Sequence, residues 1–473
     1  MNTVNIEKLK AIVGEQNILS DPADLYVYGT DASVHRAMPE AVVRPLNIEQ
    51  VQAVMRYANS EIIPVVPRGS GSGMCGQVLP SFGGLVLDLR GMNRILEINP
   101  EDGYCRVEPG VIDNDLNTAL RPYGVFYPPT PASGIVTTIG GGIANNASGM
   151  RATKYGAARD SVLALKVVMA NGDCISLGAK TRVAASGYPL EKLLIGSEGT
   201  LAIIVEATLR FVPIPKLRCL GMAKFNLLTE AGQAISETMA SGCQPSMLEL
   251  MDKVSIVAVN KAENLGLPEV EAILLFEADG PVKGVIDPEV QKFQAICEKH
   301  NGFGLEFSYD EEERARIYAG RSKLFPSLSK YDPGLSTTSL ADDMAVPFSK
   351  VAETIDMIHK IGEKRGLVWA AYGHCGAGNI HTHILLNTSD AKQWKAAKLA
   401  VSEIYDFVLS VGGTCSGEHG IGLSKAAAFK KEKNDSLELM RAIKKVFDPN
   451  NILNPGKMMD APDDWLGETQ IRY

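Results

Sequence analysis

The spacing of hydrophobic residues predicts that helices and strands alternate along the chain. Apolar residues recur at helical spacing over 6–13 and 48–58, and a short extended run lies at 41–43. From residue 62 to 211 the pattern changes to short β-branched runs bounded by glycine, asparagine or proline, which is typical of strands. The runs that predict strands are 63–66, 84–88, 105–108, 163–169 and 201–212, and one helix is predicted among them at 113–123.

Two prolines, Pro213 and Pro215, then mark a predicted domain boundary, because paired prolines continue neither a β-ladder nor a helix. After them, helical and extended patterns alternate again. The helical patterns cover 228–241, 288–299, 311–322, 348–365, 390–411 and 436–447, and the extended ones cover 272–277 and a pair of strands within 367–386. We therefore predict an α+β chain of two domains, with an antiparallel sheet in the second.

The composition narrows the class of protein. A net charge of −8 argues against nucleic acid as a partner, because nucleic acid attracts basic faces. No apolar run reaches the roughly 18 residues of a transmembrane segment, and the polar start does not resemble a signal peptide. The eight cysteines lack Cys-x-x-Cys spacing, which fits free thiols in a reducing compartment. We expect a cytoplasmic protein without a transmembrane segment.

A glycine loop follows the predicted strand at 63–66. Gly71-x-Gly73-x-x-Gly76 matches the dinucleotide fingerprint, but that fingerprint requires a helix to open at the third glycine. Residues 77–84 contain a proline and two glycines and do not predict such a helix, so a Rossmann fold is excluded. The alternatives for this loop are a flexible surface turn or a concavity of backbone N–H groups that binds an anion.

Two further glycine-rich segments favour the binding site. Thr137-Thr-Ile-Gly-Gly-Gly-Ile-Ala-Asn-Asn-Ala-Ser-Gly149 is costly to order unless a ligand lies against it, and Gly196-Ser-Glu-Gly-Thr-Leu201 opens the last strand of the region. The three segments, in this order, resemble the FAD-binding domain of the vanillyl-alcohol oxidase and p-cresol methylhydroxylase (PCMH) superfamily. The resemblance spans about residues 38–215.

This resemblance implies non-covalent FAD, with a thioether from Cys75 as the alternative. It implies that 68–73 wrap the pyrophosphate, that 131–149 line the ring system and that 196–204 close over the adenine side. The residues expected to bind FAD are Pro67, Arg68, Gly69, Ser70, Gly71, Ser72, Gly73, Gln77, Pro131, Ser133, Thr137, Thr138, Gly140, Gly141, Asn145, Ser148, Gly149, Tyr155, Glu198, Gly199, Ile204 and Asn454.

Candidate metal ligands lie in the second half of the chain. Gly373-His-Cys-Gly-Ala-Gly-Asn-Ile-His381 sits between two extended runs, and a hairpin there would bring His374 and His381 face to face. Two imidazoles in that relation are suitable ligands for zinc, iron or manganese.

A second motif, Gly412-Gly-Thr-Cys-Ser-Gly-Glu-His-Gly-Ile-Gly422, adds Glu418 and His419. Because neighbouring residues of an extended chain point to opposite sides, one of the two would bind the metal and the other would face a neighbouring pocket.

The other histidines have simpler interpretations. His35, His300 and His359 stand alone and are interpreted as hydrogen-bonded structural residues. His383 shares a strand face with His381 and could be a ligand, a partner of a ligand or a core residue; we favour a partner that orients a ligand.

The second half resembles the C-terminal domain of FAD-linked oxidases, which include D-lactate dehydrogenases, D-2-hydroxyglutarate dehydrogenases and the glycolate oxidase D subunit. The shared pattern is His-x-Gly-x-Gly-Asn-x-His, a later Gly-Glu-His-Gly, and the ending Phe447-Asp-Pro-Asn-Asn-Ile-Leu-Asn-Pro-Gly456. Ala377 departs from it, because relatives commonly carry Asp there, and this departure could loosen the contacts around the ligands.

The two resemblances together imply the domain organisation. We expect a PCMH-type FAD-binding domain of two subdomains over 1–215, with its core at 38–215, and an α+β substrate or cap domain over 216–420 that carries the metal site. The C-terminal segment, 421–473, is expected to be helical and to return to the FAD domain.

A reaction follows from these parts. A 2-hydroxy acid can chelate one metal through its hydroxyl and carboxylate, and the metal lowers the pKa of the hydroxyl. In this hypothesis His374, His381 and Glu418 hold one divalent metal (Zn²⁺, Fe²⁺ or Mn²⁺), and His419 takes the hydroxyl proton as general base. The Cα hydride passes to the flavin N5.

The resemblance adds a substrate contact and a substrate class. Arg321 is the candidate clamp for the substrate carboxylate, with an exposed helix arginine as the alternative interpretation. Relatives that act on longer dicarboxylates tend to carry a lysine shortly before the Asp343-x-x-x-Pro347 pattern, and Ala341 takes that place here. This favours a monocarboxylate, D-lactate first, over D-2-hydroxyglutarate, with glycolate as the alternative.

Two rival functions and the electron acceptor complete the predictions. A non-redox metal hydrolase would use the histidine cluster but leave the glycine-rich segments without a role. A non-catalytic subunit of a redox complex is disfavoured, because the chain carries all the metal residues. The acceptor is open among quinone, cytochrome, dioxygen and an electron-transferring flavoprotein or other redox subunit, with the flavoprotein favoured.

Overall fold

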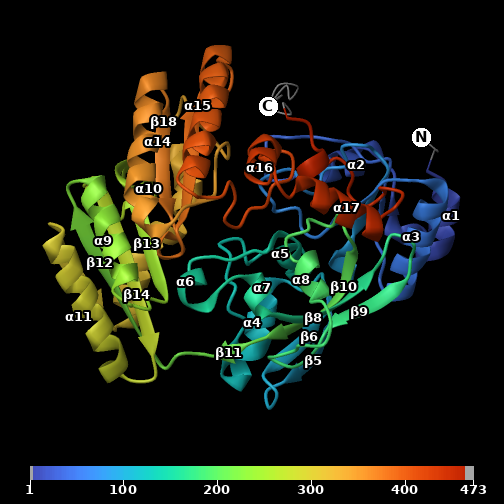
Figure 1. Ribbon diagram of the computed structural model, residues 1–473, viewed down its shortest axis with the longest axis horizontal. Helices are drawn as coiled ribbons and strands as arrows, with labels where there is room; N and C mark the ends of the chain where they lie inside the picture. The colour runs from blue at the N-terminus through green and yellow to red at the C-terminus, as the bar shows by residue number, and fades with distance from the viewer. Residues whose placement is uncertain (1–3, 464–473) are drawn as a thin grey trace. The chain divides into compact units, whose positions relative to one another are not determined.

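The computed structural model describes residues 4–463, which form two compact units. In Figure 1 the first unit is mainly blue, cyan, green and red, and the second runs mainly from yellow-green to orange. Within the described residues, the first unit consists of 4–148, 156–214 and 418–463. The second consists of Gly149–Tyr155 and Pro215–Gly417. The chain therefore enters the second unit beside the predicted boundary prolines and returns to the first at Glu418.

A four-stranded sheet opens the first unit, in the order β1-β2-β4-β3. β2, β4 and β3 are parallel and β1 is antiparallel to β2. Short β-branched runs suit these central positions, where both faces are buried. The apolar stripes of two helices, including Leu9 and Val54, pack against the sheet. The bounds are β1 Ile18–Leu19, β2 Ala41–Val43, β3 Val65–Arg68, β4 Leu85–Asp88, α1 Ile6–Val13, α2 Pro22–Tyr28 and α3 Ile48–Glu61.

A five-stranded antiparallel sheet follows, in the order β5-β6-β10-β8-β9. Its apolar face packs against Leu116 and Leu120 of α4 and Ile139 and Ile143 of α5. The bounds are β5 Ile95–Asn99, β6 Tyr104–Val107, β8 Val162–Val168, β9 Cys174–Gly178, β10 Ile203–Arg210, α4 Asp113–Leu120, α5 Ile139–Asn145, α7 Ala158–Ser161 and α8 Leu190–Leu194, with a ribbon of β7 Val125–Phe126 and β11 Val212–Pro213.

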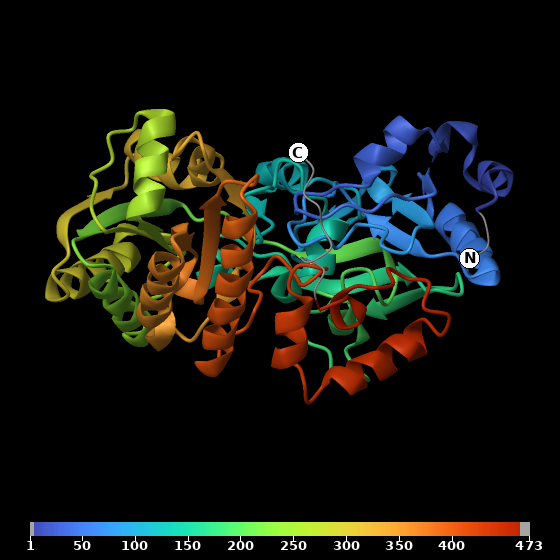
Figure 2. The same cartoon turned by 90° about the horizontal axis from the view of Figure 1, so that it is seen from above.

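The C-terminal segment completes the first unit. Ile443 and Phe447 of α17 (Leu437–Phe447) pack on the core of the five-stranded sheet, and Figure 2 shows this red helix beside the green strands. Leu453 forms a parallel bridge with Val65 of β3, whose amide donates to the carbonyl of Ile452. The preceding helix is α16 (Ala426–Glu432).

The second unit contains an antiparallel sheet in the order β15-β12-β14-β13-β18-β19-β16, and β17 pairs with β19. β13 lies between β14 and β18, and every residue of this strand is buried. The bounds are β12 Leu217–Phe225, β13 Met247–Asp252, β14 Ala272–Gly280, β15 Phe303–Ser308, β16 Ser336–Thr338, β17 Met344–Ala345, β18 Val368–Gly373 and β19 Asn379–Leu386.

Helices cover both faces of this sheet. Met247 and Met251 of β13 and Leu275 of β14 pack against α10, α12 and α13. Phe276, the strand neighbour of Leu275, points to the other face and stacks on Phe293 of α11, with ring centroids 4.3 Å apart. The bounds are α6 Ala152–Tyr155, α9 Leu228–Ala240, α10 Lys253–Glu263, α11 Lys283–Lys299, α12 Glu311–Ser322, α13 Leu324–Ser327, α14 Val351–Arg365 and α15 Ala391–Ser410.

The predicted α+β fold with antiparallel sheets is confirmed, as is the absence of a Rossmann helix after Gly76. Two elements differ from the prediction. α11 begins at Lys283 rather than at 288, because a proline near a helix start removes only one backbone hydrogen bond. Gly140, Gly141 and Gly142, for which no element was predicted, lie in the short helix α5, which the Thr138 hydroxyl caps by accepting from the Gly141 amide.

Candidate active site

The three glycine-rich segments of the first unit lie against one another. The Ser70 hydroxyl donates to the Val136 carbonyl, so the first segment touches the second. The Glu198 amide donates to the Ala144 carbonyl over 2.9 Å, so the third also touches the second. A Cβ at Gly69 would collide with the Thr138 hydroxyl, and a Cβ at Gly199 would collide with the Pro67 ring. Segments far apart in sequence therefore meet at close backbone distance, and glycine is required at these contacts.

Several predicted FAD-binding side chains make contacts within the protein. Arg68 is buried and donates to the Tyr28 and Thr30 carbonyls. The Asn454 amide donates to the carbonyls of Gln77 and Glu198 over 2.9 and 2.7 Å. Ser133 and Thr137 bond through their hydroxyls, Ile204 lies in the core of the five-stranded sheet, and Tyr155 and Gly149 belong to the second unit, where the Tyr155 hydroxyl donates to Asp279.

Glu198 is the carboxylate of this set. Its carboxylate accepts from the amides of Ile421 and Gly422 over 2.5 and 2.9 Å. Burial raises the pKa of Glu198 to about 7, against the lowering effect of these two amides. The side chain therefore fixes the loop that follows His419, and the Gln77 amide donates to the His419 carbonyl in the same loop.

The residues of the first unit fit FAD. No described residue accepts a hydrogen bond from the backbone amides of Gly71, Ser72 or Gly73, which suits them to phosphate oxygens. The Thr130 hydroxyl and the Asn454 side-chain oxygen are buried and have no hydrogen-bond partner in the described part of the chain. A ligand with a diphosphate and polar ring edges satisfies such groups. Cys75, the alternative attachment point, is buried.

In the second unit, the predicted histidine hairpin is confirmed. β18 and β19 pair antiparallel, with Tyr372 opposite His381. The rings of His374 and His381 stand at 85°, with centroids 5.0 Å apart. Gly378 closes the turn at φ 75°, and a Cβ there would strike the Val346 carbonyl. The glycine turn therefore brings the two imidazoles together.

Glu249, on β13, links two predicted site residues. One carboxylate oxygen lies 2.7 Å from Nδ1 of His374, and the other accepts from Nε of Arg321 over 2.7 Å. Glu249 is fully buried and Arg321 nearly so, which excludes the exposed-arginine interpretation. Burial alone would raise the pKa of Glu249, but the positive charges of His374 and Arg321 hold it below its usual value.

Asp343 fixes the loops beside His381. Its carboxylate accepts from the Asn379 amide over 2.8 Å, the Ser416 hydroxyl over 2.7 Å and the Gly417 amide over 3.1 Å. Asp343 and Ala341 both have left-handed backbone conformations, with φ of 66° and 55°. Such strain persists only where surrounding contacts enforce it, and it is common at functional sites.

Glu418 and His419 do not point to opposite sides, so that prediction is wrong. The chain bends at 417–419 instead of running extended, and both side chains turn the same way. Oε1 of Glu418 lies 3.9 Å from Nε2 of His419, and the Ser148 hydroxyl donates to the other Glu418 oxygen over 2.6 Å. Burial is partial for both residues.

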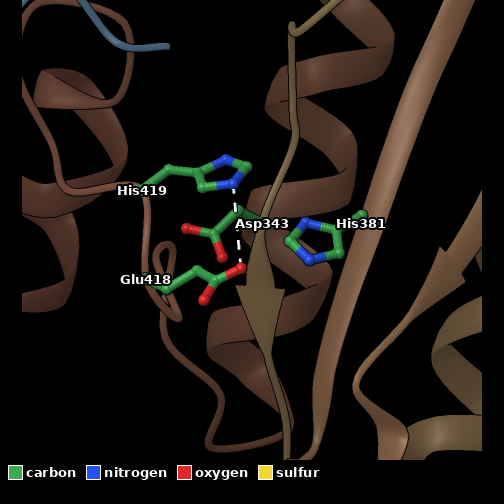
Figure 3. Close-up of side chains that lie close together, drawn as sticks. All are labelled: Asp343, His381, Glu418 and His419. Carbon is green, nitrogen blue, oxygen red and sulfur yellow. Dashed lines mark ion pairs between the residues drawn. The ribbon is translucent and has the colours of Figure 1, made fainter. Parts of the chain in front are cut away.

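Four side chains are close enough to share a metal ion. Ligand atoms of Asp343, His381, Glu418 and His419 lie within 4.8 Å of one another (Figure 3). The hydrogen bond from the Gly417 amide to the Asp343 carboxylate explains part of this grouping, because Glu418 follows Gly417 directly in the chain. The group contains two of the three predicted ligands and the predicted base. His374 lies next to His381 but outside the group.

The remaining histidines have protein partners. Nε2 of His300 lies 2.7 Å from Glu237, and Nε2 of His359 lies 3.4 Å from Asp252. His35 bonds to Ser424 over 2.9 Å, and burial lowers its pKa to about 4. Nε2 of His383 lies 2.8 Å from the Tyr372 hydroxyl, outside the ligand group. These contacts agree with the interpretation of His35 and His300 as hydrogen-bonded structural residues, whereas His359 forms an ion pair with Asp252.

Comparisons with known proteins decide the family. Residues 214–458 match the model of FAD linked oxidases, C-terminal domain, and residues 39–178 match the FAD binding domain. The chain belongs to the FAD-linked oxidase family. It is 36% identical over 455 residues to glycolate oxidase subunit GlcD of Bacillus subtilis, covering 96% of each chain. It is also 36% identical to the mitochondrial D-lactate dehydrogenase [cytochrome] of Arabidopsis thaliana, covering 96% of this chain and 80% of that one.

Solved structures show the same fold. The FAD-linked oxidase superposes on p-cresol methylhydroxylase with a TM-score of 0.78 at 18% identity, covering 96% of this chain and 95% of that one. For 4-ethylphenol oxidase of Gulosibacter chungangensis the TM-score is 0.79 at 20% identity, covering 97% of each chain. The predicted PCMH-type fold is confirmed, and the chain is an FAD-linked oxidoreductase of the family that includes D-lactate dehydrogenases and GlcD subunits. Among residues 4–463, no helix has the length and apolar character needed to cross a membrane.

Sequence reasoning missed two residues of the candidate site in this FAD-linked oxidase. Glu249 is the only acidic residue between Met247 and Met251 on a buried strand, and a carboxylate in such a position needs a charged partner. That signal was available, although it did not identify the partner. Asp343 follows Asp342, and neither residue belongs to a glycine-rich motif. Its role becomes visible only when three loops meet around its carboxylate.

Proposed function

We propose that this FAD-linked oxidase is a metal-dependent dehydrogenase that oxidises a D-2-hydroxy acid to the 2-oxo acid, with D-lactate as the first candidate substrate. The observation that carries the proposal is the grouping of Asp343, His381, Glu418 and His419, whose ligand atoms lie within 4.8 Å. The relatives named as D-lactate dehydrogenase and glycolate oxidase subunit support the substrate class.

A metal fits the donor set. Imidazole nitrogens with a carboxylate oxygen are typical ligands of Zn²⁺, Fe²⁺ and Mn²⁺. His374, His381 and Glu418 would hold it, and Asp343 is a further oxygen donor within range. When bound, the metal lowers the pKa of a coordinated hydroxyl.

The protein's own groups then have distinct roles. His419 takes the substrate hydroxyl proton on an imidazole nitrogen. Arg321 pairs with the substrate carboxylate through its terminal nitrogens, because its Nε is bonded to Glu249. The three glycine-rich segments hold FAD, which supplies the hydride acceptor. Electrons then leave to a separate acceptor, for which we propose an electron-transferring flavoprotein.

Ala341 supports a small monocarboxylate. It is 4% exposed and brings no charge to the loop that precedes Asp343. A dicarboxylate such as D-2-hydroxyglutarate would leave its second carboxylate without a cation from this position. Glycolate remains the second candidate, because the GlcD relatives are as similar as the D-lactate dehydrogenases.

The direct test is anaerobic reduction of the bound flavin by D- and L-2-hydroxy acids. We expect bleaching of the flavin absorbance by D-lactate and much slower bleaching by L-lactate and D-2-hydroxyglutarate. Reoxidation by an electron-transferring flavoprotein, a quinone and dioxygen then ranks the acceptors. A colourless folded protein, or a flavin that no hydroxy acid reduces, would refute the proposal.

The metal assignment has its own test. His374→Ala should lose most of its bound metal by elemental analysis and keep its FAD. His300→Ala is the matched control, because it removes a histidine that contacts Glu237 far from the ligand group in sequence. Wild-type metal content in His374→Ala would remove His374 from the ligand set.

A further inference from the structure

Glu249 uses its two oxygens for two different purposes. It lies at the centre of β13 and is 0% exposed. Oε1 meets the imidazole of His374, which follows β18, and Oε2 meets the guanidinium of Arg321 on α12, each over 2.7 Å. A single buried carboxylate therefore touches the predicted metal ligand and the predicted substrate clamp, and the proposed reaction assigns it no step.

The contact with His374 fixes the form of the imidazole. A carboxylate only accepts hydrogen bonds, so the hydrogen lies on Nδ1 of His374, and in the neutral imidazole the lone pair is then on Nε2. Nε2 is then the nitrogen that can bind a metal. A carboxylate behind a ligating histidine also orients the ring and makes it a stronger ligand.

The contact with Arg321 fixes the direction of the guanidinium. Nε donates to Glu249, and the guanidinium carbon lies 4.8 Å from the centre of the Tyr372 ring. No described residue accepts a hydrogen bond from the two terminal nitrogens of Arg321. These nitrogens form the end of the fork that suits bidentate binding of a carboxylate.

We infer that Glu249 is a positioning residue that couples the binding of the substrate carboxylate to the binding of the metal. This inference rests on the proposed function. A metal on Nε2 of His374 strengthens the Nδ1 hydrogen bond to Oε1, and a carboxylate on Arg321 competes with Oε2 for the same cation. Both events act on one carboxylate, so each changes the affinity for the other by the same factor.

The test measures zinc affinity rather than turnover. The probe is isobutyrate, which presents a carboxylate to Arg321 but lacks the hydroxyl that would chelate the zinc directly. Zn²⁺ dissociation constants are measured on the FAD-loaded protein by chelator competition, with and without the probe. In the wild type the probe should change the zinc affinity by at least about fivefold, the lower end of typical coupling between sites.

Glu249→Gln keeps the side-chain volume and removes the charge. It should weaken zinc binding by about 10- to 100-fold, the usual effect of losing a partner behind a metal ligand, and abolish the effect of the probe. Glu237→Gln is the matched control, because Glu237 also lies 2.7 Å from a histidine, His300, and has no place in the site. It should behave as the wild type does.

Arg321→Lys keeps the inference testable if Glu249→Gln does not fold. It leaves Glu249 and His374 in place, so zinc affinity without the probe should stay within about twofold of wild type, while the effect of the probe is lost. A probe effect that survives in Arg321→Lys, wild-type zinc affinity in a folded Glu249→Gln, or no probe effect in the wild type would overturn the coupling. Failure of the proposed function is distinguishable from failure of the coupling. If the proposed function is wrong, the wild type itself binds no zinc or shows no flavin reduction, so no variant is needed to detect it.

Discussion

The glycine-lined region, made of segments 67–77, 131–149 and 196–204, and the histidine–carboxylate region around His381 and Glu249 are built on opposite principles. In the first, glycines bring backbone close to backbone and leave amides for a ligand. In the second, ionisable side chains on strands and tight turns point at one another. The first region therefore requires residues without a side chain, and the second requires particular ionisable side chains.

This difference predicts how each region responds to substitution. In the glycine-lined region even a methyl group is too large, because a Cβ at Gly69 would collide with the Thr138 hydroxyl. In the histidine–carboxylate region, a substitution of equal size can be accommodated, but it removes a proton acceptor, a ligand or a charge. The first kind of change should reduce FAD occupancy, and the second should reduce turnover.

The largest effect is expected for His419→Ala. Loss of a general base lowers kcat by about 10²- to 10⁴-fold, while FAD and metal should both remain. The measurement combines kcat with flavin absorbance and elemental analysis, and His300→Ala serves as control. An unchanged kcat would refute the role of His419 as general base. Loss of the metal would instead identify His419 as a metal ligand, because it belongs to the group of four.

A smaller effect is expected for Gly69→Ala, which should weaken FAD binding rather than slow the chemical step. The added Cβ must displace Thr138, which caps α5, and overpacking of this kind costs about 1 to 3 kcal/mol. FAD affinity should fall by roughly 5- to 150-fold, as measured by titration of the apoprotein. Gly284→Ala is the control, because nothing lies within 4 Å of its added Cβ. Equal FAD affinities in the two variants would contradict the comparison.

The smallest effect is a change of stability with pH at the edge of the glycine-lined region. The Asp113 amide donates to the Thr137 carbonyl, and burial raises the pKa of Asp113 from 3.8 to about 7. The folded state thus keeps a proton that the unfolded state loses between about pH 4 and pH 7, and stability falls as pH rises through this window.

Asp113→Asn removes that dependence and should raise Tm at pH 8 relative to wild type, with less gain at pH 4. Each kcal/mol gained moves Tm by roughly 2 to 4 °C. Thermal unfolding at the two pH values measures it. A gain of the same size at both would mean that Asp113 titrates normally.

The two regions also differ in how far the sequence predicts them. Where the interacting residues are consecutive, as in the turn from His374 to His381, prediction succeeded, because turn geometry is local. Prediction failed for the direction of Glu418 and His419, since the bend at 417–419 depends on contacts with Asp343. Glu249 meets its partners only after β13 pairs with β18, and no local pattern encodes that pairing.

The bridge between Val65 and Leu453 has a consequence for synthesis. β3 is made early, but its edge partner, the Ile452–Asn454 stretch, emerges from the ribosome about 390 residues later, which takes roughly 20 to 80 seconds at typical elongation rates. Throughout that interval the nascent first unit presents an unpaired strand edge, while the second unit, complete by Gly417, is free to fold. A stretch translated about 390 residues after β3 thus completes the edge of the first sheet.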